Sequence, residues 1–178
     1  MIIVSHYSSL LGDILIAVQN DKLVGLWLEN QKHYLSNFKE NVKEDNQNEI
    51  ILQVKSWLDR YFNRENPSIK QLDIELIGTE FQKMVWKILQ TIPYGTVITY
   101  KDIALEIAKQ KGIKSMSSQA VGSAVGRNPI SIIIPCHRVL GSNKSLTGYA
   151  GGIDKKIKLL ELENVELSTF TIPKEKSN

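Results

Sequence analysis

Cys136 is the one cysteine of the 178-residue chain, and it stands in the run Pro135-Cys136-His137-Arg138. Positive charges beside a thiol favour the thiolate, which is the nucleophilic form of cysteine. On an extended strand neighbouring side chains point to opposite faces, so Cys136 and His137 need a turn or a bridging water to share a proton. A lone cysteine is also commonly a small buried hydrophobe without chemistry. The pattern therefore predicts either a nucleophile beside a base or a plain core residue.

The cysteine count also limits metal chemistry and location. One thiol excludes an internal disulfide and any zinc site built from several cysteines, so we expect no bound metal. A free cysteine favours a reducing compartment, which predicts a cytoplasmic location. No apolar run approaches the roughly 18 residues of a membrane span, and Met1 to Ser9 lacks the features of a secretory signal. We expect no membrane partner.

Charge is distributed unevenly along the sequence. Residues 1–79 carry 8 Lys and Arg against 11 Asp and Glu, whereas residues 80–178 carry 14 against 8. The stretch from Ile107 to Ile153 has no carboxylate, and its cations are Lys109, Lys111, Lys114, Arg127, Arg138 and Lys144. Such a window indicates a polyanionic partner such as a nucleic-acid backbone, because clustered cations release its condensed counterions. A basic, solvated surface without a partner has the same composition.

Periodicity predicts the elements that must position the cysteine. Short apolar runs predict strands at 2–5, 11–18, 23–28, 72–77 and 131–134, with a polar turn at Ser8-Ser9. Apolar residues three and four apart predict amphipathic helices over 51–62 and 154–163. The polar stretch 33–48 predicts a loop or a loosely packed helix.

Composition changes at Gly78-Thr79, which predicts a domain boundary. We expect an N-terminal scaffold domain over 1–78, a C-terminal domain over 79–170 and a flexible tail over 171–178. The cysteine and the basic window both belong to the second domain.

Three helix starts follow this boundary. Thr79 with Gln82 and Thr99 with Asp102 have the spacing of a capping box. Ser117 or Ser118 can cap a third helix, which follows a break at Lys111-Gly112. Two short helices, a break and a helix of small residues resemble a helix-turn-helix, in which Gln119, Ser123 and Arg127 would face a partner. Two packed helices without nucleic acid fit the same pattern.

The cysteine motif extends beyond its immediate neighbours. Ile134-Pro135-Cys136-His137-Arg138-Val139, together with Ala120-Val121-Gly122, Asn128-Pro129, Gly148-Tyr149-Ala150-Gly151-Gly152, Leu159-Leu160 and Glu163, resembles the active-site pattern of the O6-alkylguanine-DNA alkyltransferases. The resemblance covers about residues 79–164. It implies an α+β fold with an N-terminal α/β, ribonuclease H-like domain that contains a small sheet. A mostly helical C-terminal domain of winged-helix or helix-turn-helix type would carry the active site.

The resemblance also implies a function. Members of this family bind double-stranded DNA through the minor groove and flip O6-alkylguanine into a pocket. The alkyl group then moves irreversibly and stoichiometrically to the cysteine, without a cofactor. O4-alkylthymine is a further expected substrate. A single-turnover methylated-DNA–protein-cysteine methyltransferase that acts as a monomer is therefore expected.

Roles follow position by position from the resemblance. His137 would be the base that reaches Cys136 through a water, and Glu163 would orient His137. Tyr149 would donate a proton toward the leaving guanine, and Asn128 would be the hinge between the recognition helix and the cysteine segment. The remaining pocket positions implied are Val125, Ser131, the backbone of Val139 and Cys136, and the backbone N–H of Ala150. Arg138 would have a structural or electrostatic role.

DNA contacts also follow from the resemblance. Tyr100 would push the phosphate beside the flipped nucleotide, and residues of the recognition helix would enter the groove. These are Gln119, Ala120, Gly122, Ser123 and Arg127. Gln119 stands where well-studied members have arginine, so one charge is missing and a shallower salt dependence is expected. Ser131 and Val125 are smaller than the residues of some members, which predicts a roomier pocket.

Three other functions remain open from the residues. A non-catalytic sensor of alkylated bases shares the fold but lacks the cysteine, so Cys136 argues against it. A cysteine hydrolase could use Cys136, His137 and Glu163, although its histidine is usually distant in sequence. A transcription regulator would need a longer basic recognition helix and a dimer element.

Overall fold

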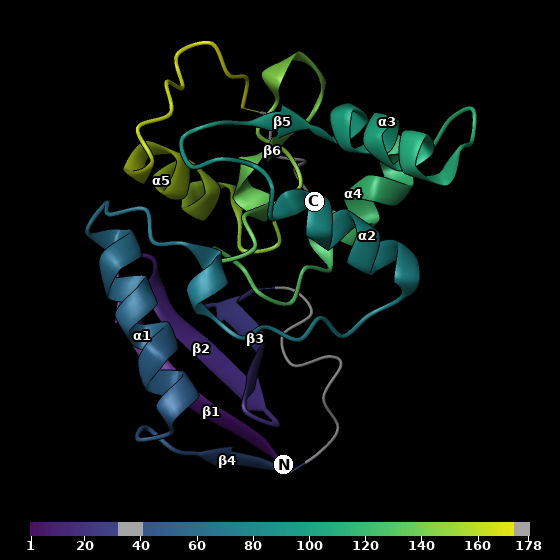
Figure 1. The fold of residues 1–178 in the computed structure, drawn as a ribbon. Helices are drawn as coiled ribbons and strands as arrows, with labels where there is room; N and C mark the ends of the chain where they lie inside the picture. Colours follow the sequence, from purple (N-terminus) through teal and green to yellow (C-terminus); the bar gives the residue numbers. More distant parts are fainter. Residues whose placement is uncertain (32–40, 173–178) are drawn as a thin grey trace.

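The computed structural model describes residues 1–31 and 41–172. Figure 1 shows a sheet with helix α1 in the N-terminal half and a cluster of helices in the C-terminal half. Within the described residues no helix is long and apolar enough to cross a membrane. The predicted arrangement of an N-terminal sheet followed by a mostly helical part is confirmed.

Four strands form the sheet, in the order β3-β2-β1-β4. They are β1 (Ile2–Ser9), β2 (Gly12–Gln19), β3 (Lys22–Leu28) and β4 (Val42–Glu44), with β4 parallel to β1 and the other pairs antiparallel. The predicted turn at Ser8-Ser9 is wrong, because both serines pair with β2 and the turn lies at residues 10–11. Ser9 Oγ accepts from Leu11 N (3.0 Å) and donates to the carbonyl of Gly12 (2.8 Å), so its polar group closes the turn from within the strand.

Strand β4 lies in the stretch 33–48 that was predicted as a loop or helix. Its three residues are all exposed, so it has no buried face that could produce an apolar alternation in the sequence. Residues 32–40 of the same stretch lie outside the described part of the chain.

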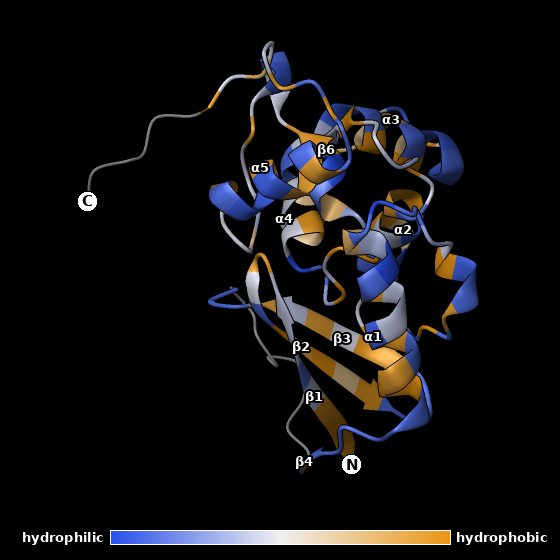
Figure 2. Ribbon diagram, turned by 90° about the vertical axis from the view of Figure 1, so that its left-hand side faces the viewer, coloured by the Kyte–Doolittle hydropathy of each residue, from blue (hydrophilic) through white to orange (hydrophobic). Residues whose placement is uncertain are grey.

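Helix α1 (Glu49–Phe62) covers one face of the sheet and confirms the amphipathic pattern. The side chain of Asn48 caps its first turn by accepting from the N–H groups of Ile50 and Ile51. The buried face consists of Ile51, Val54, Trp57, Leu58 and Tyr61. Figure 2 shows the hydrophobic residues of the strands beside this helix. The end of α1 thus brings Tyr61 toward the C-terminal half.

The outer edge of β3 is shared between two segments. Leu23 forms a single parallel bridge with Ile74, after the short helix η1 (Ile69–Gln71). Leu26 bridges Ile130 of the C-terminal half. The predicted strand 72–77 is therefore wrong. Only Ile74 of this segment pairs with β3, because the edge of β3 at Leu26 pairs with Ile130 instead. This edge pairing and a hydrophobic core common to both halves join the two parts of the protein.

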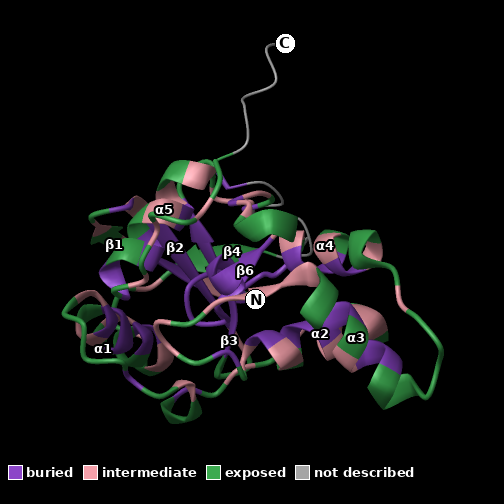
Figure 3. Ribbon diagram, turned by 90° about the horizontal axis from the view of Figure 1, so that it is seen from above, coloured by how far each residue is buried: buried purple, intermediate pink, exposed green. Residues whose placement is uncertain are grey.

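Within the described residues, four α-helices build the C-terminal half. They are α2 (Glu80–Leu89), α3 (Tyr100–Lys111), α4 (Ser118–Gly126) and α5 (Ile153–Leu162). Both predicted capping boxes are present, and Ser117 caps α4. Gly112, with a φ of 65°, ends α3 in the left-handed conformation that glycine adopts without cost. Figure 3 shows exposed residues on the outward sides of α3 and α4, and buried residues toward the interior.

Two short parallel strands, β5 (Ile98–Thr99) and β6 (Val139–Leu140), connect α3 to the cysteine segment. Near them lie the 3-10 helices η2 (Cys136–Arg138) and η3 (Ser142–Lys144). After α5, Thr171 at the start of the predicted tail bridges Ser145. Residues 173–178 of that tail lie outside the described residues.

The predicted strand 131–134 is wrong, although its burial is confirmed. These residues form consecutive turns, in which Ile134 N donates to Ile130 O (3.0 Å) and Ser131 N donates to Leu26 O (2.9 Å). A short buried apolar run cannot be assigned to a strand by periodicity alone. Ile132 has a φ of 70°, which strains a β-branched residue by about 1–3 kcal/mol.

Candidate active site

Cys136, His137 and Arg138 form the short helix η2, with Pro135 as its N-terminal cap. Cys136 N donates to Ile134 O (2.8 Å), and Arg138 N donates to Pro135 O (3.0 Å). All three side chains are buried, and that of His137 is fully so. The turn removes the alternation that an extended strand would impose on Cys136 and His137. Both side chains can therefore serve one site.

Glu163 follows directly after α5, and its carboxylate bonds several groups of this site. Its Oε2 lies 2.6 Å from His137 Nε2 and accepts from the hydroxyl of Tyr61 at 2.5 Å. Its Oε1 accepts from Arg138 Nε at 2.7 Å and from the backbone N–H of Gly95 at 3.1 Å. A second Arg138 nitrogen, Nη2, donates to Oε2 at 3.1 Å. The carboxylate is fully buried and multiply satisfied, as a buried charge must be.

These contacts decide the protonation of the pair. Burial by itself raises the pKa of Glu163, but the bonds and charges of His137 and Arg138 outweigh it and hold that pKa well below its usual value. Burial lowers the pKa of His137 against the pull of Glu163, so the imidazole is neutral near pH 7. His137 Nδ1 is buried and has no hydrogen-bond partner in the described protein. With Nε2 facing the carboxylate, this nitrogen is the one free to accept a proton.

The thiol is held in its neutral form at rest. Burial raises the pKa of Cys136, opposed by a hydrogen bond from Asn128 and by the charge of Lys156. Asn128 also donates to Ile134 O at 2.8 Å and accepts from Ile130 N at 3.0 Å. It therefore ties the end of α4 to the cysteine segment. A nucleophilic thiol here requires a base to take its proton.

Lys156 is a site residue that sequence reasoning missed. Its Nζ is fully buried and donates to Val139 O at 2.6 Å and to Thr147 O at 2.9 Å. Burial lowers its pKa to about 8, while the nearby Cys136 acts in the opposite direction. One signal was available: Lys156 precedes the buried Leu159 and Leu160 by three and four residues, so it lies on their face of the helix.

Two tyrosines line the same region. The hydroxyl of Tyr149 is buried and makes no hydrogen bond within the described residues, and burial raises its pKa well above the usual value. Tyr100 donates to Thr147 O at 3.2 Å, and burial followed by the Cys136 charge raises its pKa to about 12. A Cβ at Gly148 would lie 2.6 Å from the Tyr100 hydroxyl, so only glycine fits there. Both phenols therefore remain proton donors at neutral pH.

The other expected pocket residues are buried or half-buried, and two of them already make hydrogen bonds. Val125 and Val139 are buried, Ala150 is half-buried, and the Val139 carbonyl already accepts from Lys156. Ser131 is buried, but its hydroxyl donates to Gln31 Oε1 of the N-terminal half at 2.9 Å. Ser131 is thus anchored to the other domain.

The expected DNA contacts lie together on α4 and its end. Gln119, Ser123 and Arg127 are exposed, whereas Ala120 and Gly122 are half-buried. A Cβ at Gly122 would lie 3.8 Å from the Tyr100 ring, so α4 and the start of α3 approach closely. Along the chain, the exposed residues of α4 are separated from Cys136 only by the segment 128–135, which the hydrogen bonds of Asn128 hold in place.

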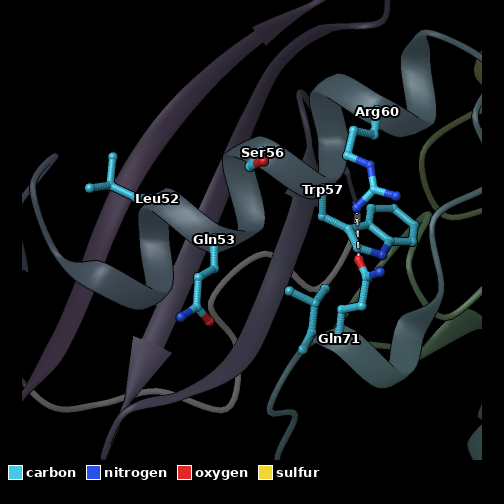
Figure 4. Close-up of a pocket in the computed structure, with 7 residues that line it drawn as sticks. Leu52, Gln53, Ser56, Trp57, Arg60 and Gln71 are labelled. Atoms are coloured by element: carbon cyan, nitrogen blue, oxygen red, sulfur yellow. Dashed lines mark hydrogen bonds between the residues drawn. The ribbon is translucent and has the colours of Figure 1, made fainter.

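Among the described residues, one cavity lies apart from this arrangement and another borders it. One, of about 390 Å³, is an open hollow on α1 lined by residues that include Leu52, Trp57, Arg60 and Gln71, with Arg60 donating to Gln71 at 2.9 Å (Figure 4). It contains none of the predicted site residues. The other, of about 330 Å³, lies between α1 and the back of the cysteine turn and includes Tyr61, Pro135 and Arg138. The described residues contain no cluster of His, Cys, Asp and Glu that could bind a metal ion.

Fold and site together define an α+β protein in which a helix-turn-helix half carries a buried thiol, imidazole and carboxylate. The ribonuclease-like domain of 6-O-methylguanine DNA methyltransferase matches residues 2–76, and the DNA-binding domain of the same family matches residues 80–165. This chain belongs to the 6-O-methylguanine DNA methyltransferase family.

Individual relatives agree with this assignment. The chain is 37% identical over 163 residues to the methylated-DNA–protein-cysteine methyltransferase of Haemophilus influenzae, covering 90% of this chain and 86% of that protein. It is 45% identical to the Mycobacterium leprae protein of the same name, over 69% of this chain and 71% of the relative. The structure of Mycobacterium tuberculosis OGT in complex with DNA superposes with a TM-score of 0.78 at 37% identity, covering 90% of this chain and 92% of that one.

Proposed function

We propose that this protein repairs double-stranded DNA by moving the alkyl group of O6-alkylguanine, and also of O4-alkylthymine, to Sγ of Cys136. One observation carries the proposal. The Cys136 turn holds His137 against the carboxylate of Glu163, in the half of the chain that has the helix-turn-helix. Family membership supports the same activity. No cofactor is needed, because the protein itself accepts the alkyl group.

DNA binding must expose the damaged base before the transfer. The alkylated oxygen is inaccessible in a stacked duplex, so the nucleotide is flipped out at a cost of a few kcal/mol. Helix α4 would enter the minor groove, with Gln119 filling the gap left by the base and Arg127 beside the backbone. Tyr100, at the start of α3, would face the phosphate of the flipped nucleotide. One protein molecule contains all these groups, which supports a monomer.

The transfer itself needs one proton moved and one bond exchanged. His137 Nδ1, through a water, takes the proton of the Cys136 thiol, and Glu163 stabilises the resulting imidazolium. The thiolate attacks the alkyl carbon, so that an S–C bond forms as the C–O6 bond breaks. The guanine anion leaves and takes up a proton, for which the buried, unpartnered hydroxyl of Tyr149 is the candidate donor. The proton that His137 took from the thiol then restores the tyrosine. The thioether is stable, so each molecule acts once.

The pocket for the base would use mainly backbone groups. The Ala150 N–H would bond the alkylated oxygen, and the carbonyls of Cys136 and Val139 would bond the exocyclic amine. Val125 and Ser131 leave room beside the alkyl group, which supports acceptance of adducts larger than methyl. The need for a reduced thiol supports a cytoplasmic location.

The experiment is an intact-mass measurement after incubation with a duplex that carries one O6-methylguanine. We expect a gain of one methyl group per protein, mapped to Cys136 and saturating at one equivalent. Tight binding without a mass change would replace the proposal with a sensor function. No binding and no mass change would favour a hydrolase that uses the same three residues.

A further inference from the structure

Tyr61 is the one side chain of the N-terminal half that bonds the carboxylate of Glu163 among the described contacts. It lies at the end of α1, which approaches α5 in Figure 1, and its hydroxyl donates to Glu163 Oε2 at 2.5 Å. The two residues are 102 positions apart, and both are buried. Nothing in the relay that consists of Cys136, His137 and Glu163 requires this hydroxyl.

The oxygen that Tyr61 occupies is the one that faces the imidazole. Oε2 also lies 2.6 Å from His137 Nε2, so tyrosine and histidine share one acceptor. Donors on a carboxylate compete for its negative charge, and each one that is added reduces what the carboxylate offers to the others. Tyr61 therefore limits how strongly Glu163 can stabilise a protonated His137.

Packing fixes the tyrosine in this position. Its ring stacks on Trp57 with centroids 5.6 Å apart, and it meets Phe62 and Tyr94 edge-on at 5.4 and 6.3 Å. Burial, followed by the charge of Glu163, raises the pKa of Tyr61 well above its usual value. The hydroxyl therefore stays protonated and remains a donor wherever the histidine titrates.

We propose that Tyr61 is a positioning residue for the transfer reaction, through which the N-terminal half orients Glu163 and sets the basicity of His137. The inference rests on the proposed function for its rate measurement only. It predicts that the N-terminal half contributes directly to the chemistry as well as to the fold.

Other charged and titratable groups face His137 and have to be held constant in a test. These are Glu163 and Lys156 from α5 and its end, and Cys136 and Arg138 from η2. A Tyr61→Phe substitution leaves all of them in place and keeps the aromatic ring. It removes only the hydroxyl from Oε2.

The experiment measures the methyl-transfer rate of the full-length protein, and the NMR titration of the His137 ring, across the pH range in which histidine titrates. Without the tyrosine donor Glu163 binds the imidazolium more strongly. We expect the acid side of the pH–rate profile and the ring titration of Tyr61→Phe to move to higher pH by about half a unit. The shift is smaller than the full strength of a hydrogen bond to a carboxylate, because the lost bond acts on His137 only through the shared oxygen. A ring-fluorinated tyrosine at position 61, a stronger donor, should move both to lower pH.

Tyr7→Phe is the matched control. Tyr7 also donates to a carboxylate, Asp59 of α1, at 2.7 Å, but it lies outside the site. The acid side of the pH–rate profile of Tyr7→Phe should therefore coincide with that of the wild type. The inference would be overturned if the acid side of the pH–rate profile of Tyr61→Phe stayed in place or moved to lower pH, even if the melting temperature of the variant fell. If the wild type transfers no methyl group, the proposed function fails, and the ring titration still decides the role of Tyr61.

Discussion

The carboxylate end of the site and its thiol end are built in opposite ways. Glu163 accepts hydrogen bonds from four residues, and both oxygens are satisfied. At the other end, His137 Nδ1 and the Tyr149 hydroxyl are buried without partners in the described protein. A buried polar atom without a partner costs about 1–3 kcal/mol, so such atoms persist mainly where a water or a substrate completes them.

The comparison separates a rigid support from a reactive surface. Glu163, Arg138 and Tyr61 hold one another, so a change there alters geometry and stability together. Cys136 and Tyr149 belong to the end that, in the proposed mechanism, the flipped base and a water would complete. Effects of substitution should therefore differ in kind between the two ends.

The largest effect is expected at the thiol end. Cys136→Ala should abolish methyl transfer and leave binding to alkylated DNA intact. The substitution removes the thiol that accepts the methyl group, but it keeps the backbone carbonyl through which Cys136 would contact the base. Intact mass and a gel-shift titration on the same duplex measure the two properties. Residual transfer would reveal another acceptor group.

At the carboxylate end, Glu163→Gln should slow transfer by about 10²-fold or more, because His137 loses the charge that stabilises its protonated form. Single-turnover rates, taken below the melting temperature of the variant, measure this loss. Glu161→Gln, at an exposed position of α5, is the matched control. A rate equal to that of the wild type would remove Glu163 from the relay.

Asn128→Ala tests the connection between recognition helix and thiol. It leaves the Ile130 N–H and the Ile134 carbonyl without their side-chain partner in a buried setting, at a cost of about 1–3 kcal/mol. Thermal unfolding should show this loss, together with a slower transfer. Wild-type values for both stability and rate would contradict the hinge role.

Acid below about pH 4.5 should weaken the carboxylate end of the site. The pKa of Glu163 is lowered by folding, so its contribution to stability is present above the unfolded value of about 4.5 and is lost as pH falls below it. Unfolding free energy should therefore decrease more steeply on acidification in the wild type than in Glu163→Gln. Equal slopes, measured by denaturant titration at several pH values, would show that Glu163 is not the group responsible.

The smallest effect is expected on the DNA-binding surface, beyond both ends of the relay. Gln119→Arg adds one cation to the exposed face of α4. The slope of log affinity against log salt should steepen by about 1, with little change in transfer rate at saturating DNA. An unchanged slope would place Gln119 away from the phosphates.

Local features of the fold could be predicted from the sequence. Thr79, Thr99 and Ser117 cap helices at the expected residues, because a cap bonds the backbone only two or three residues away. The strand over 23–28 and the helix over 51–62 are confirmed for a similar reason, since the first is a short apolar run and the second repeats apolar residues three and four apart. The motif around Cys136 also indicated the family, which the comparisons show.

Features that depend on distant partners could not be predicted this way. Segment 131–134 has the composition of a strand, yet its turn is set by Leu26, which accepts from Ser131 N across the domain boundary. The same edge of β3 leaves only Ile74 of segment 72–77 a strand-like pairing. The sequence of either segment alone does not show which residues pair with the edge of β3.

The sequence by itself determined the helix caps, the strand over 23–28 and the amphipathic helix over 51–62. It also placed a thiol between a proline and two basic residues. The family resemblance also implied that Glu163 would orient His137, and the two side chains do lie 2.6 Å apart. Only the tertiary structure decided that Tyr61 and Lys156 would be buried beside them. The physical reason is the distance along the chain over which each interaction acts. Capping and periodicity act within a few residues, whereas the protonation of the site depends on desolvation and on charges from α1, α5 and η2 that are brought together only by the common core.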